Sequence, residues 1–453
     1  MVADEFIFAN VGRVTDAICS EFGDVSHENR SMIVAHDTRF MGEDFAAECA
    51  RWVANRGFEA LLCNGPTPTP TVSHAIRSQK AACGINFTAS HNPPEYNGMK
   101  LSTADGAPAL PNITQKIEQR LAVSRDSVFV QDNVGATPRL FDPKEAYLAD
   151  LESKIRFDII AKAGCRYAYD PLWGTGRGYL DELLRRHSLE VETIHDWRDV
   201  LFGGRSPEPE ASHLDDLTEV VLGKKCVLGL ATDGDGDRFG VIDSNGRFIT
   251  PNQLIAILFD YLVESRSWVG GVARSVATSH LVDRVAEKRG RAVYETPVGF
   301  KFIGELINED KIILGGEESA GLSIKGHYPE KDGILACLLA AEAVAARGAS
   351  LTDQLEALFA ETGRLQSERI GVRLTPELMP KLKEKLNEEP TTLGGRRVKE
   401  INRLDGVKII FQDDSWLLVR PSGTEPLVRI YAESEKAQDV EVLLEQGRKY
   451  LLG

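Results

Sequence analysis

The chain has 453 residues, of which 42% are apolar and 27% charged, and its formal net charge is −15. A chain of this length exceeds what one hydrophobic core supports, so we expect roughly two to four domains. The acidic balance argues against general nucleic-acid binding, and no run approaches the ~18 uninterrupted apolar residues of a membrane helix.

The N-terminus and the cysteines indicate a cytoplasmic protein. Asp4 and Glu5 stand where a secretory signal carries basic residues. The seven cysteines are scattered without a CxxC pair, which disfavours a disulfide framework or a zinc site. The sequence leaves the oligomeric state open between monomer and dimer.

The first region predicts a mostly parallel sheet. Residues 32–37 (MIVAHD) and 60–65 (ALLCNG) are short β-rich runs on either side of residues 42–57, whose apolar residues recur at helical spacing. Such a βαβ pattern is typical of a parallel sheet with crossover helices. A second α/β region begins near residue 165, and a third includes a predicted helix over residues 333–348.

Each region contains an apolar run that gives way to a loop of small and polar residues. The three stretches are CGINFTASHNP, VLGLATDGDGD and IILGGEESAG. Because ligands bind beyond the carboxyl ends of parallel strands, we expect chemistry in these loops. The alternative is that they are unrelated surface turns.

The last ~85 residues predict a separate α+β domain. Residues 376–389 have a charged helical pattern, and residues 415–434 hold two β-rich runs joined by a tight polar loop.

The loop DGDGD alternates Asp233, Asp235 and Asp237 with glycines. Three hard oxygen ligands with little steric bulk between them suit Mg²⁺. An EF-hand is excluded, because arginine and serine occupy the positions where its loop needs glycine and glutamate. A solvated acidic turn is the alternative, although three such close carboxylates repel one another without a cation.

The third-region loop offers Glu317 and Ser319, a carboxylate and a hydroxyl suited to hydrogen bonds with a sugar. A plain glycine-rich turn is the alternative. Further on, Asp332 precedes the predicted helix and is expected to cap its N-terminus. Lys331 would then face the cleft.

The loop VRPSGTEPLVR (419–429) places hydroxyls and backbone N–H groups between two arginines. Guanidiniums and loop amides form a fixed set of donors for phosphate, and no P-loop sequence is present. A plain hairpin is the alternative. The candidate phosphate ligands are Arg420, Ser422, Gly423, Thr424 and Arg429.

Ser90 lies beside His91 in NFTASHNPPEYNGMK, but no GxSxG elbow is present, and neighbours on an extended chain point to opposite faces. A hydrolase triad is therefore not expected. An exposed loop serine fits phosphoryl transfer, since a phosphoserine oxygen would complete the Mg²⁺ coordination. Lys100 is a candidate proton shuttle if nearby cations lower its pKa. Alternatively, His91 is a locally hydrogen-bonded loop residue and the stretch is a set of turns.

The motifs TASHNP, DGDGDR, GEESAG and RPSGTEP, in this order, closely resemble the α-D-phosphohexomutase superfamily, which includes phosphoglucomutase and phosphomannomutase. The resemblance covers essentially the whole chain and includes HDTRF (36–40). It implies three similar α/β domains with mixed, mostly parallel sheets and a C-terminal α+β domain around a central cleft. The implied ranges are 1–141, 142–250, 251–365 and 366–453.

The resemblance also implies residue roles. Ser90 would carry the phosphoryl group, with Mg²⁺ held by its phosphoryl oxygen and the three aspartates. Arg238 would contact that group, His91 and Lys100 would lie beside it, and Lys331 would be the general base. Sugar contacts would come from Gly299, Phe300, Glu317 and Ser319, and the C-terminal loop would hold the phosphate that does not react.

The implied reaction interconverts hexose 1-phosphate and hexose 6-phosphate, with glucose 1,6-bisphosphate as intermediate and activator. TPVGFK and EKDG resemble the phosphoglucomutase forms, which favours glucose phosphates. Phe300 stands where many phosphoglucomutases have tryptophan, so mannose phosphates or dual specificity stay open.

One segment departs from the family pattern. Family members usually begin with a GTxGxR-like stretch whose arginine lies near the phosphoserine, whereas MVADEFIFANVGRVTDA resembles the stretch just after it. We expect either that a strand and an active-site arginine are missing or that the natural start lies upstream. A sugar-phosphate-binding protein with little or no turnover is therefore an alternative hypothesis, and a serine hydrolase is a third.

Overall fold

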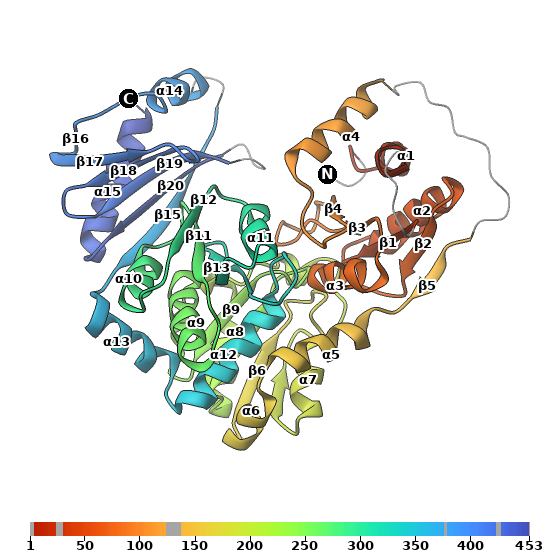
Figure 1. Ribbon diagram of the computed structural model, residues 1–453, viewed down its shortest axis with the longest axis horizontal. Coiled ribbons are helices and arrows are strands. Elements are labelled where there is room, and N and C mark those ends of the chain that lie inside the picture. The colour runs from red at the N-terminus through yellow and green to blue at the C-terminus, as the bar shows by residue number, and fades with distance from the viewer. Residues whose placement is uncertain (1–3, 24–29, 124–136, 376–377, 423–426, 453) are drawn as a thin grey trace.

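The computed structural model describes residues 4–23, 30–123, 137–375, 378–422 and 427–452. Four sheets follow one another along the chain. In Figure 1 the first domain lies at the right in red and orange, the last at the upper left in blue, and the second and third lie between and below them. The expected architecture of three α/β domains and a C-terminal α+β domain is confirmed. Each sheet falls within one of the expected ranges, whose exact limits stay predictions.

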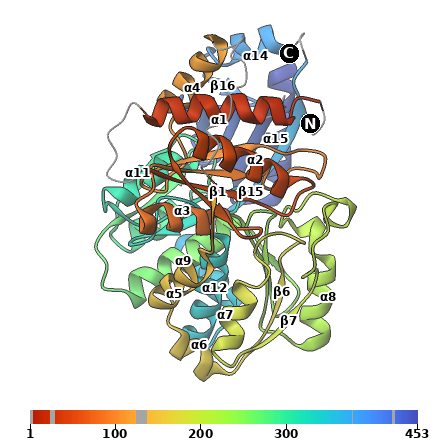
Figure 2. The same ribbon diagram turned by 90° about the vertical axis from the view of Figure 1, so that its right-hand side faces the viewer.

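The first domain has the strand order β4-β3-β1-β2-β5. Its strands are β1 (Ser31–His36), β2 (Glu59–Cys63), β3 (Cys83–Phe87), β4 (Met99–Thr103) and β5 (Arg139–Phe141), and its helices are α1 (Phe8–Gly23), α2 (Gly42–Asn55), α3 (Thr69–Gln79) and α4 (Pro111–Val123). Met32 and Val34 of β1 pack with α1, α2 and α4, while Ile33 and Ala35 pack with α3. Figure 2 shows α1 and α2 together on their face of the sheet. The predicted βαβ unit is confirmed.

The second and third domains repeat this strand arrangement. The second contains α5 (Lys144–Lys154), α6 (Phe157–Ala163), β6 (Arg166–Asp170), α7 (Leu180–Arg186), β7 (Glu190–Thr193), the 3₁₀ turns η1 (Phe202–Gly204) and η2 (Ala211–His213), α8 (Asp215–Lys224), β8 (Leu228–Thr232), β9 (Phe239–Asp243) and β10 (Phe248–Ile249). The third contains α9 (Pro251–Ser265), β11 (Gly271–Ser275), α10 (Leu281–Lys288), β12 (Val293–Thr296), α11 (Phe300–Asn308), β13 (Ile312–Glu317), β14 (Gly321–Ile324), α12 (Gly333–Arg347) and α13 (Leu351–Thr362). In all three domains the first strand lies between the second and third, parallel to both, and the third turns back into an antiparallel fourth.

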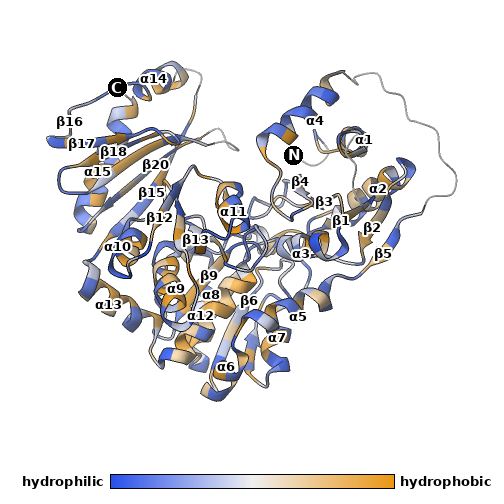
Figure 3. Cartoon of the chain, viewed as in Figure 1, coloured by the Kyte–Doolittle hydropathy of each residue, from blue (hydrophilic) through white to orange (hydrophobic). Residues whose placement is uncertain are grey.

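One hydrophobic core serves the second and third domains together. It joins residues of α5, β6 and β8 to residues of α9, β13 and α12. Figure 3 shows hydrophobic residues along the inner strands and along α9. Gly333, at the start of α12, lies so close to the second domain that a Cβ there would collide with the carbonyl oxygen of Arg238. The two domains therefore form one packed unit.

The last domain has an antiparallel sheet, in the order β15-β20-β19-β18-β17-β16. Its elements are β15 (Gln366–Arg373), α14 (Leu378–Lys385), β16 (Thr392–Leu393), β17 (Arg396–Asn402), β18 (Val407–Phe411), β19 (Trp416–Pro421), β20 (Leu427–Ser434) and α15 (Ala437–Leu452). Trp416, Leu418 and Tyr431 pack against Val276 and Ala277 of the third domain. The charged helix expected over 376–389 is shorter, and residues 376–377 lie outside the described residues.

Within the described ranges, no single helix is long and apolar enough to cross a membrane. Among the helices that the structure describes, one pair, α12 and α13, meets the length and composition of a span when taken together, and the two helices are bent by 78° relative to each other.

Candidate active site

The three expected loops occupy equivalent places. Ser90 lies between β3 and β4, the aspartates between β8 and β9, and Ser319 between β13 and β14. Each loop follows the carboxyl end of the third strand of its domain, where ligands bind in parallel sheets. Each of the three α/β domains therefore carries its candidate functional loop at the same place in the fold.

Ser90 is held against the aspartate loop of the second domain. Its Oγ donates a hydrogen bond of 2.7 Å to Oδ2 of Asp233, and its backbone N–H donates to Oγ1 of Thr88 at 2.8 Å. The residue is only 8% exposed, so the expectation of an exposed loop serine is wrong. The aspartate loop packs over it, since a Cβ at Gly234 would lie 2.6 Å from the carbonyl oxygen of Ser90.

His91 lies on the same side as Ser90, with its Nδ1 3.5 Å from the serine Oγ. The expectation that the two side chains point to opposite faces is wrong, because Ser90 has a φ of 51° and the chain turns there. Burial lowers the pKa of His91, and so do the positive charges of Arg238 and Lys331.

Asp233, Asp235 and Asp237 form the one group of three metal-ligand side chains found in the described part of the chain. All three are fully buried, and one carboxylate oxygen from each lies within 4.8 Å of the others. Among the described residues, Oδ1 of Asp235 and Oδ1 of Asp237 are buried without a hydrogen-bond partner. Buried carboxylate oxygens with unused lone pairs fit a hard divalent cation such as Mg²⁺. Burial and the neighbouring carboxylates raise the pKa of Asp233.

Two lysines contact the same carboxylates. Lys100 Nζ donates to Oδ2 of Asp235 at 2.6 Å and to Oδ2 of Asp237 at 2.8 Å, and Lys331 Nζ donates to Asp237 at 2.8 Å. A lowered pKa was the condition for Lys100 as a proton shuttle, and this condition is not met. Burial alone would lower that pKa, but the two carboxylates raise it above its ordinary value.

Asp332 caps α12 as expected, accepting from Leu335 N–H at 2.8 Å.

The expected sugar contacts lie in the third domain. Oε1 of Glu317 accepts a 2.7 Å hydrogen bond from the N–H of Gly299, which has a φ of 130°. Burial, and then the charge of Glu318, raise the pKa of Glu317 to about 7. Ser319 is half-buried, and Phe300 packs in an apolar cluster at 4% exposure.

The arginines of the C-terminal loop are cross-strand neighbours. Arg420 on β19 pairs in register with Arg429 on β20, and Arg420 Nε donates to Asp405 at 2.6 Å. Ser422 N–H donates to the carbonyl of Leu427 at 2.8 Å. Gly423 and Thr424 lie outside the described residues.

A cavity of about 360 Å³ brings three domains together. Its lining includes His91 and Asn92 of the first domain, Glu208 of the second, and Arg369 and Arg429 of the last. The candidate phosphate ligand Arg429 therefore lines the same space as the neighbour of Ser90.

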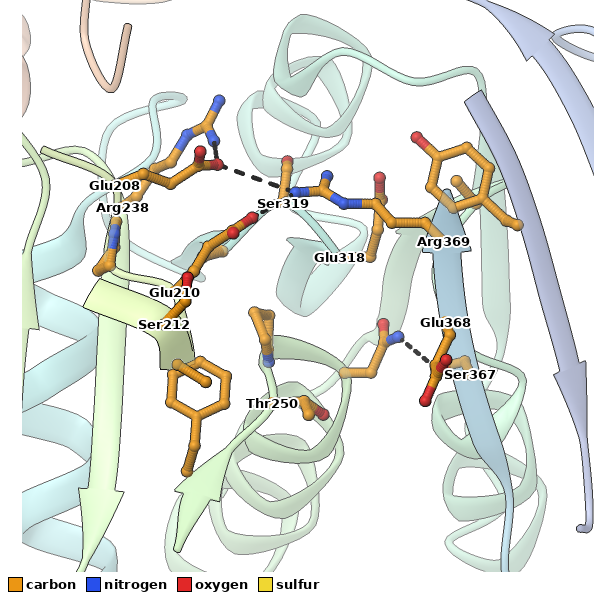
Figure 4. A pocket seen from close by; sticks show the side chains of 18 of the residues that line it. Glu208, Glu210, Ser212, Arg238, Thr250, Glu318, Ser319, Ser367, Glu368 and Arg369 are labelled. Atoms are coloured by element: carbon orange, nitrogen blue, oxygen red, sulfur yellow. Dashed lines mark hydrogen bonds and ion pairs between the residues drawn. The ribbon is translucent and has the colours of Figure 1, made fainter. Parts of the chain in front are cut away.

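A second cavity, of about 560 Å³, is lined by Arg238 and Ser319 among others. In Figure 4, Glu208 lies between Arg238 and Arg369, and Oε1 of Glu208 is 3.1 Å from Arg238 Nη1. Arg369 Nη2 also donates to Glu210 at 2.9 Å. The two cavities share Glu208 and Arg369 in their linings.

Sequence reasoning missed Thr69, Glu208 and Arg369 entirely, and noted Arg39 only as part of HDTRF. Thr69 and Arg39 each contact the site through hydrogen bonds described below. The first residue of HDTRF, His36, is the last residue of the buried strand β1. The polar residues that follow it therefore lie at the carboxyl end of the strand, where ligands bind in parallel sheets, and this position could have marked Arg39. No local pattern marks Thr69, Glu208 or Arg369.

Comparisons with known proteins identify the family of the chain. Four family models match in chain order: phosphoglucomutase/phosphomannomutase alpha/beta/alpha domains I (residues 2–126), II (145–246) and III (250–362), and the C-terminal domain (376–448). The chain therefore belongs to the phosphoglucomutase/phosphomannomutase family of the α-D-phosphohexomutase superfamily, and it is an isomerase of the phosphohexomutase class.

Individual relatives carry different substrate names. A probable phosphoglucosamine mutase of Methanosphaera stadtmanae is 32% identical, over 94% of this chain and 91% of its own. A phosphoglucomutase/phosphomannomutase of Thermococcus kodakarensis is 30% identical, over 94% and 90%. The crystal structure of a putative phosphomannomutase from Thermus thermophilus has a TM-score of 0.87 and 33% identity, covering 100% of this chain and 96% of that one.

Proposed function

We propose that the chain interconverts hexose 1-phosphates and hexose 6-phosphates through a phosphoserine at Ser90. The observation that carries the proposal is the 2.7 Å hydrogen bond from Ser90 Oγ to Asp233, one of three buried carboxylates in the neighbouring domain. A serine placed against a candidate metal site has the surroundings that phosphoryl transfer requires.

The aspartate loop would hold Mg²⁺. Asp233, Asp235 and Asp237, together with the phosphoryl oxygen on Ser90, supply hard oxygen ligands. A bound Mg²⁺ would neutralise negative charge on the transferring group. Arg238 and Lys100 would add positive charge beside it.

The protein's own part in the reaction is chiefly positioning. The hydroxyl oxygen of the sugar monophosphate forms a bond to phosphorus as the bond from phosphorus to Ser90 Oγ breaks. Lys331, acting as the neutral amine, takes the hydroxyl proton, and Ser90 Oγ keeps the electron pair of the broken bond and takes up a proton. The hexose bisphosphate then turns over and returns its other phosphoryl group to Ser90. Arg420, Ser422, Gly423, Thr424 and Arg429 would hold the phosphate that is not reacting. The cavity that joins His91 to Arg429 supports this arrangement.

We propose glucose phosphates as the preferred substrates, with glucose 1,6-bisphosphate as activator. TPVGFK and EKDG support this choice, and Glu317 and Ser319 would bind the sugar hydroxyls. Gly299 would act through its hydrogen bond to Glu317. Because Phe300 is buried, it would support the loop that contains Gly299 and would offer little surface for contact with the sugar. A phosphomannomutase or a dual-specificity enzyme is the alternative, since the relatives carry both names.

A side-by-side assay tests the proposal. Glucose, mannose and glucosamine 1-phosphates are each supplied with Mg²⁺ and glucose 1,6-bisphosphate, and formation of the 6-phosphate is followed. We expect turnover, fastest with glucose 1-phosphate, and its loss in Ser90→Ala. Ser73→Ala removes a buried hydroxyl from the same domain and is the matched control. Full activity in Ser90→Ala would refute the mechanism, and a faster rate with mannose phosphate would refute only the substrate.

A further inference from the structure

Arg39 lies beneath the loop that carries Ser90. The residue is 1% exposed and follows β1 at the ligand edge of the first sheet. Its guanidinium donates to four backbone carbonyls of the loop: Nη2 to Ser90 at 2.7 Å and to Asn92 at 2.6 Å, and Nη1 to Pro93 at 2.7 Å and to Tyr96 at 3.0 Å. The Arg39 side chain thus connects the backbone at Ser90 to the backbone at Tyr96, at the other end of the same loop.

The guanidinium is itself held from two sides. Arg39 Nε donates to Oδ2 of Asp37 at 3.0 Å, and the backbone N–H of Arg39 donates to Oδ1 at 2.9 Å. The ring of Phe202, from the second domain, lies 5.0 Å from the guanidinium carbon. A planar fork fixed by a carboxylate and covered by an aromatic ring has little freedom to move.

The Ser90 loop needs such support. Ser90 has a φ of 51°, a left-handed conformation that costs free energy for a residue with a side chain. Its carbonyl faces the tightly packed Gly234, and a buried carbonyl without a donor is costly. Arg39 supplies that donor and so stabilises the turn that points Ser90 Oγ toward Asp233.

We propose that Arg39 is a positioning residue for phosphoryl transfer, which holds Ser90 on the metal loop while the serine alternates between its free and phosphorylated states. The inference rests on the proposed role of Ser90. Arg39 acts through backbone carbonyls and does not line either cavity described above. Its loss therefore affects the placement of the reacting oxygen more than the binding of the sugar phosphate.

Lysine cannot replace Arg39, because a single ammonium cannot reach four carbonyls and Asp37 in the geometry of a fork. A displacement of the reacting group of the order of 1 Å lowers a rate about 100-fold. We expect Arg39→Lys to lower kcat by roughly 10- to 100-fold while KM for hexose phosphate changes less than about 3-fold. We also expect guanidinium ion to restore part of kcat in Arg39→Ala, because it can occupy the vacated site.

The experiment measures kcat, KM and melting temperature for the full chain with Mg²⁺ and bisphosphate. Val53→Ala, a fully buried change in α2 of the same domain, is the matched control for lost stability and should keep kcat. Phe202→Leu removes the ring over the guanidinium without removing a hydrogen bond, and we expect it to lower kcat by a few-fold. This variant keeps the proposal testable if both arginine variants fail to fold.

The outcomes separate the two proposals. Turnover in Ser90→Ala would overturn the proposed function, whatever the Arg39 variants do. If Ser90→Ala is inactive but a folded Arg39→Lys keeps normal kcat, only the role of Arg39 is overturned. It is equally overturned if both arginine variants are unfolded and Phe202→Leu has normal kcat, or if the kcat loss of Arg39→Ala matches that of Val53→Ala at equal melting temperature.

Discussion

Thr69 of the first domain holds Asp235 of the second by two hydrogen bonds. Its Oγ1 donates to Oδ2 of Asp235 at 2.6 Å, and its backbone N–H donates to the Asp235 carbonyl at 2.8 Å. Asn86 Nδ2 donates in turn to the Thr69 hydroxyl at 2.9 Å. The candidate metal loop is therefore oriented by the domain that carries Ser90.

Thr69→Val should weaken Mg²⁺ activation. The substitution keeps the shape of the side chain but removes a donor that orients a ligand carboxylate, a loss that typically lowers metal affinity 10- to 100-fold. Activity measured over a Mg²⁺ titration checks this expectation. Thr71→Val, at a buried position in the same helix, should leave the titration midpoint unchanged. Equal midpoints for Thr69→Val and the wild type would contradict the prediction.

Glu317→Gln should lose substrate affinity and gain stability. The pKa of Glu317 is raised from its ordinary 4.5 to about 7, by burial first and then by Glu318. Between these values the folded chain keeps a proton that the unfolded chain releases, so the contribution of Glu317 to stability falls as pH rises through 7. Removing the buried charge should raise the free energy of unfolding by about 1–3 kcal/mol at pH 8 and leave little gain at pH 4.

Denaturant unfolding of the wild type and Glu317→Gln at pH 4 and 8 checks this sign, and KM for glucose 1-phosphate should rise in the same variant. Glu305→Gln, at an exposed position on α11 of the same domain, is the control, because Glu305 is not among the charges that shift the pKa of Glu317. A variant that is less stable than the wild type at pH 8 would show that the charged form is favoured.

Lys408 should make the contact between the third and last domains depend on pH. This fully buried lysine on β18 donates to the Val276 carbonyl and to His280 Nε2, both at 2.8 Å, and lies 4.1 Å from the ring of Trp416. Burial, and then the charge of Arg274, lower the pKa of Lys408 from 10.5 to about 8. Between those values the unfolded chain binds more protons than the folded chain.

The contribution of Lys408 to the free energy of unfolding should therefore rise with pH across this window, by up to about 3 kcal/mol. Unfolding of the wild type and Lys408→Met at pH 8 and 10 measures the difference in slope. Parallel pH profiles would mean that the ammonium is not penalised by its burial.

Arg429→Lys should raise KM while changing kcat little. Lysine keeps the charge but loses the paired donors with which arginine binds phosphate, and we expect a rise of roughly 10-fold for glucose 1-phosphate. Steady-state kinetics checks this, with Arg396→Lys as the control, because Arg396 pairs with Asp413 and Asp439 in the same domain. An unchanged KM would remove Arg429 from the phosphate site.

The sequence predicted well those features that depend on local pattern. Apolar periodicity located β1, β2 and α2, and the alternation of aspartate with glycine indicated the candidate metal loop. The cap at Asp332 was also predictable, because capping is a local interaction. The family motifs then connected loops that lie more than a hundred residues apart.

Features that depend on contacts between domains were not predictable. The environment of Lys100 is set by Asp235 and Asp237 from another domain, so its pKa is raised where a lowered value was required. Ser90 is buried by the second domain, and its positive φ brings His91 to the same side. Thr69 gives no local signal, because its importance comes only from its contact with Asp235.

The most direct test of the account follows the phosphoryl group itself. The protein is labelled with radioactive phosphate from glucose 1,6-bisphosphate, freed of excess sugar, and mixed rapidly with unlabelled glucose 1-phosphate and Mg²⁺. We predict that the label resides on Ser90 and passes to the sugar at least as fast as kcat. Label that stays on the protein, or that leaves as inorganic phosphate while the enzyme turns over normally, would contradict a phosphoserine mechanism.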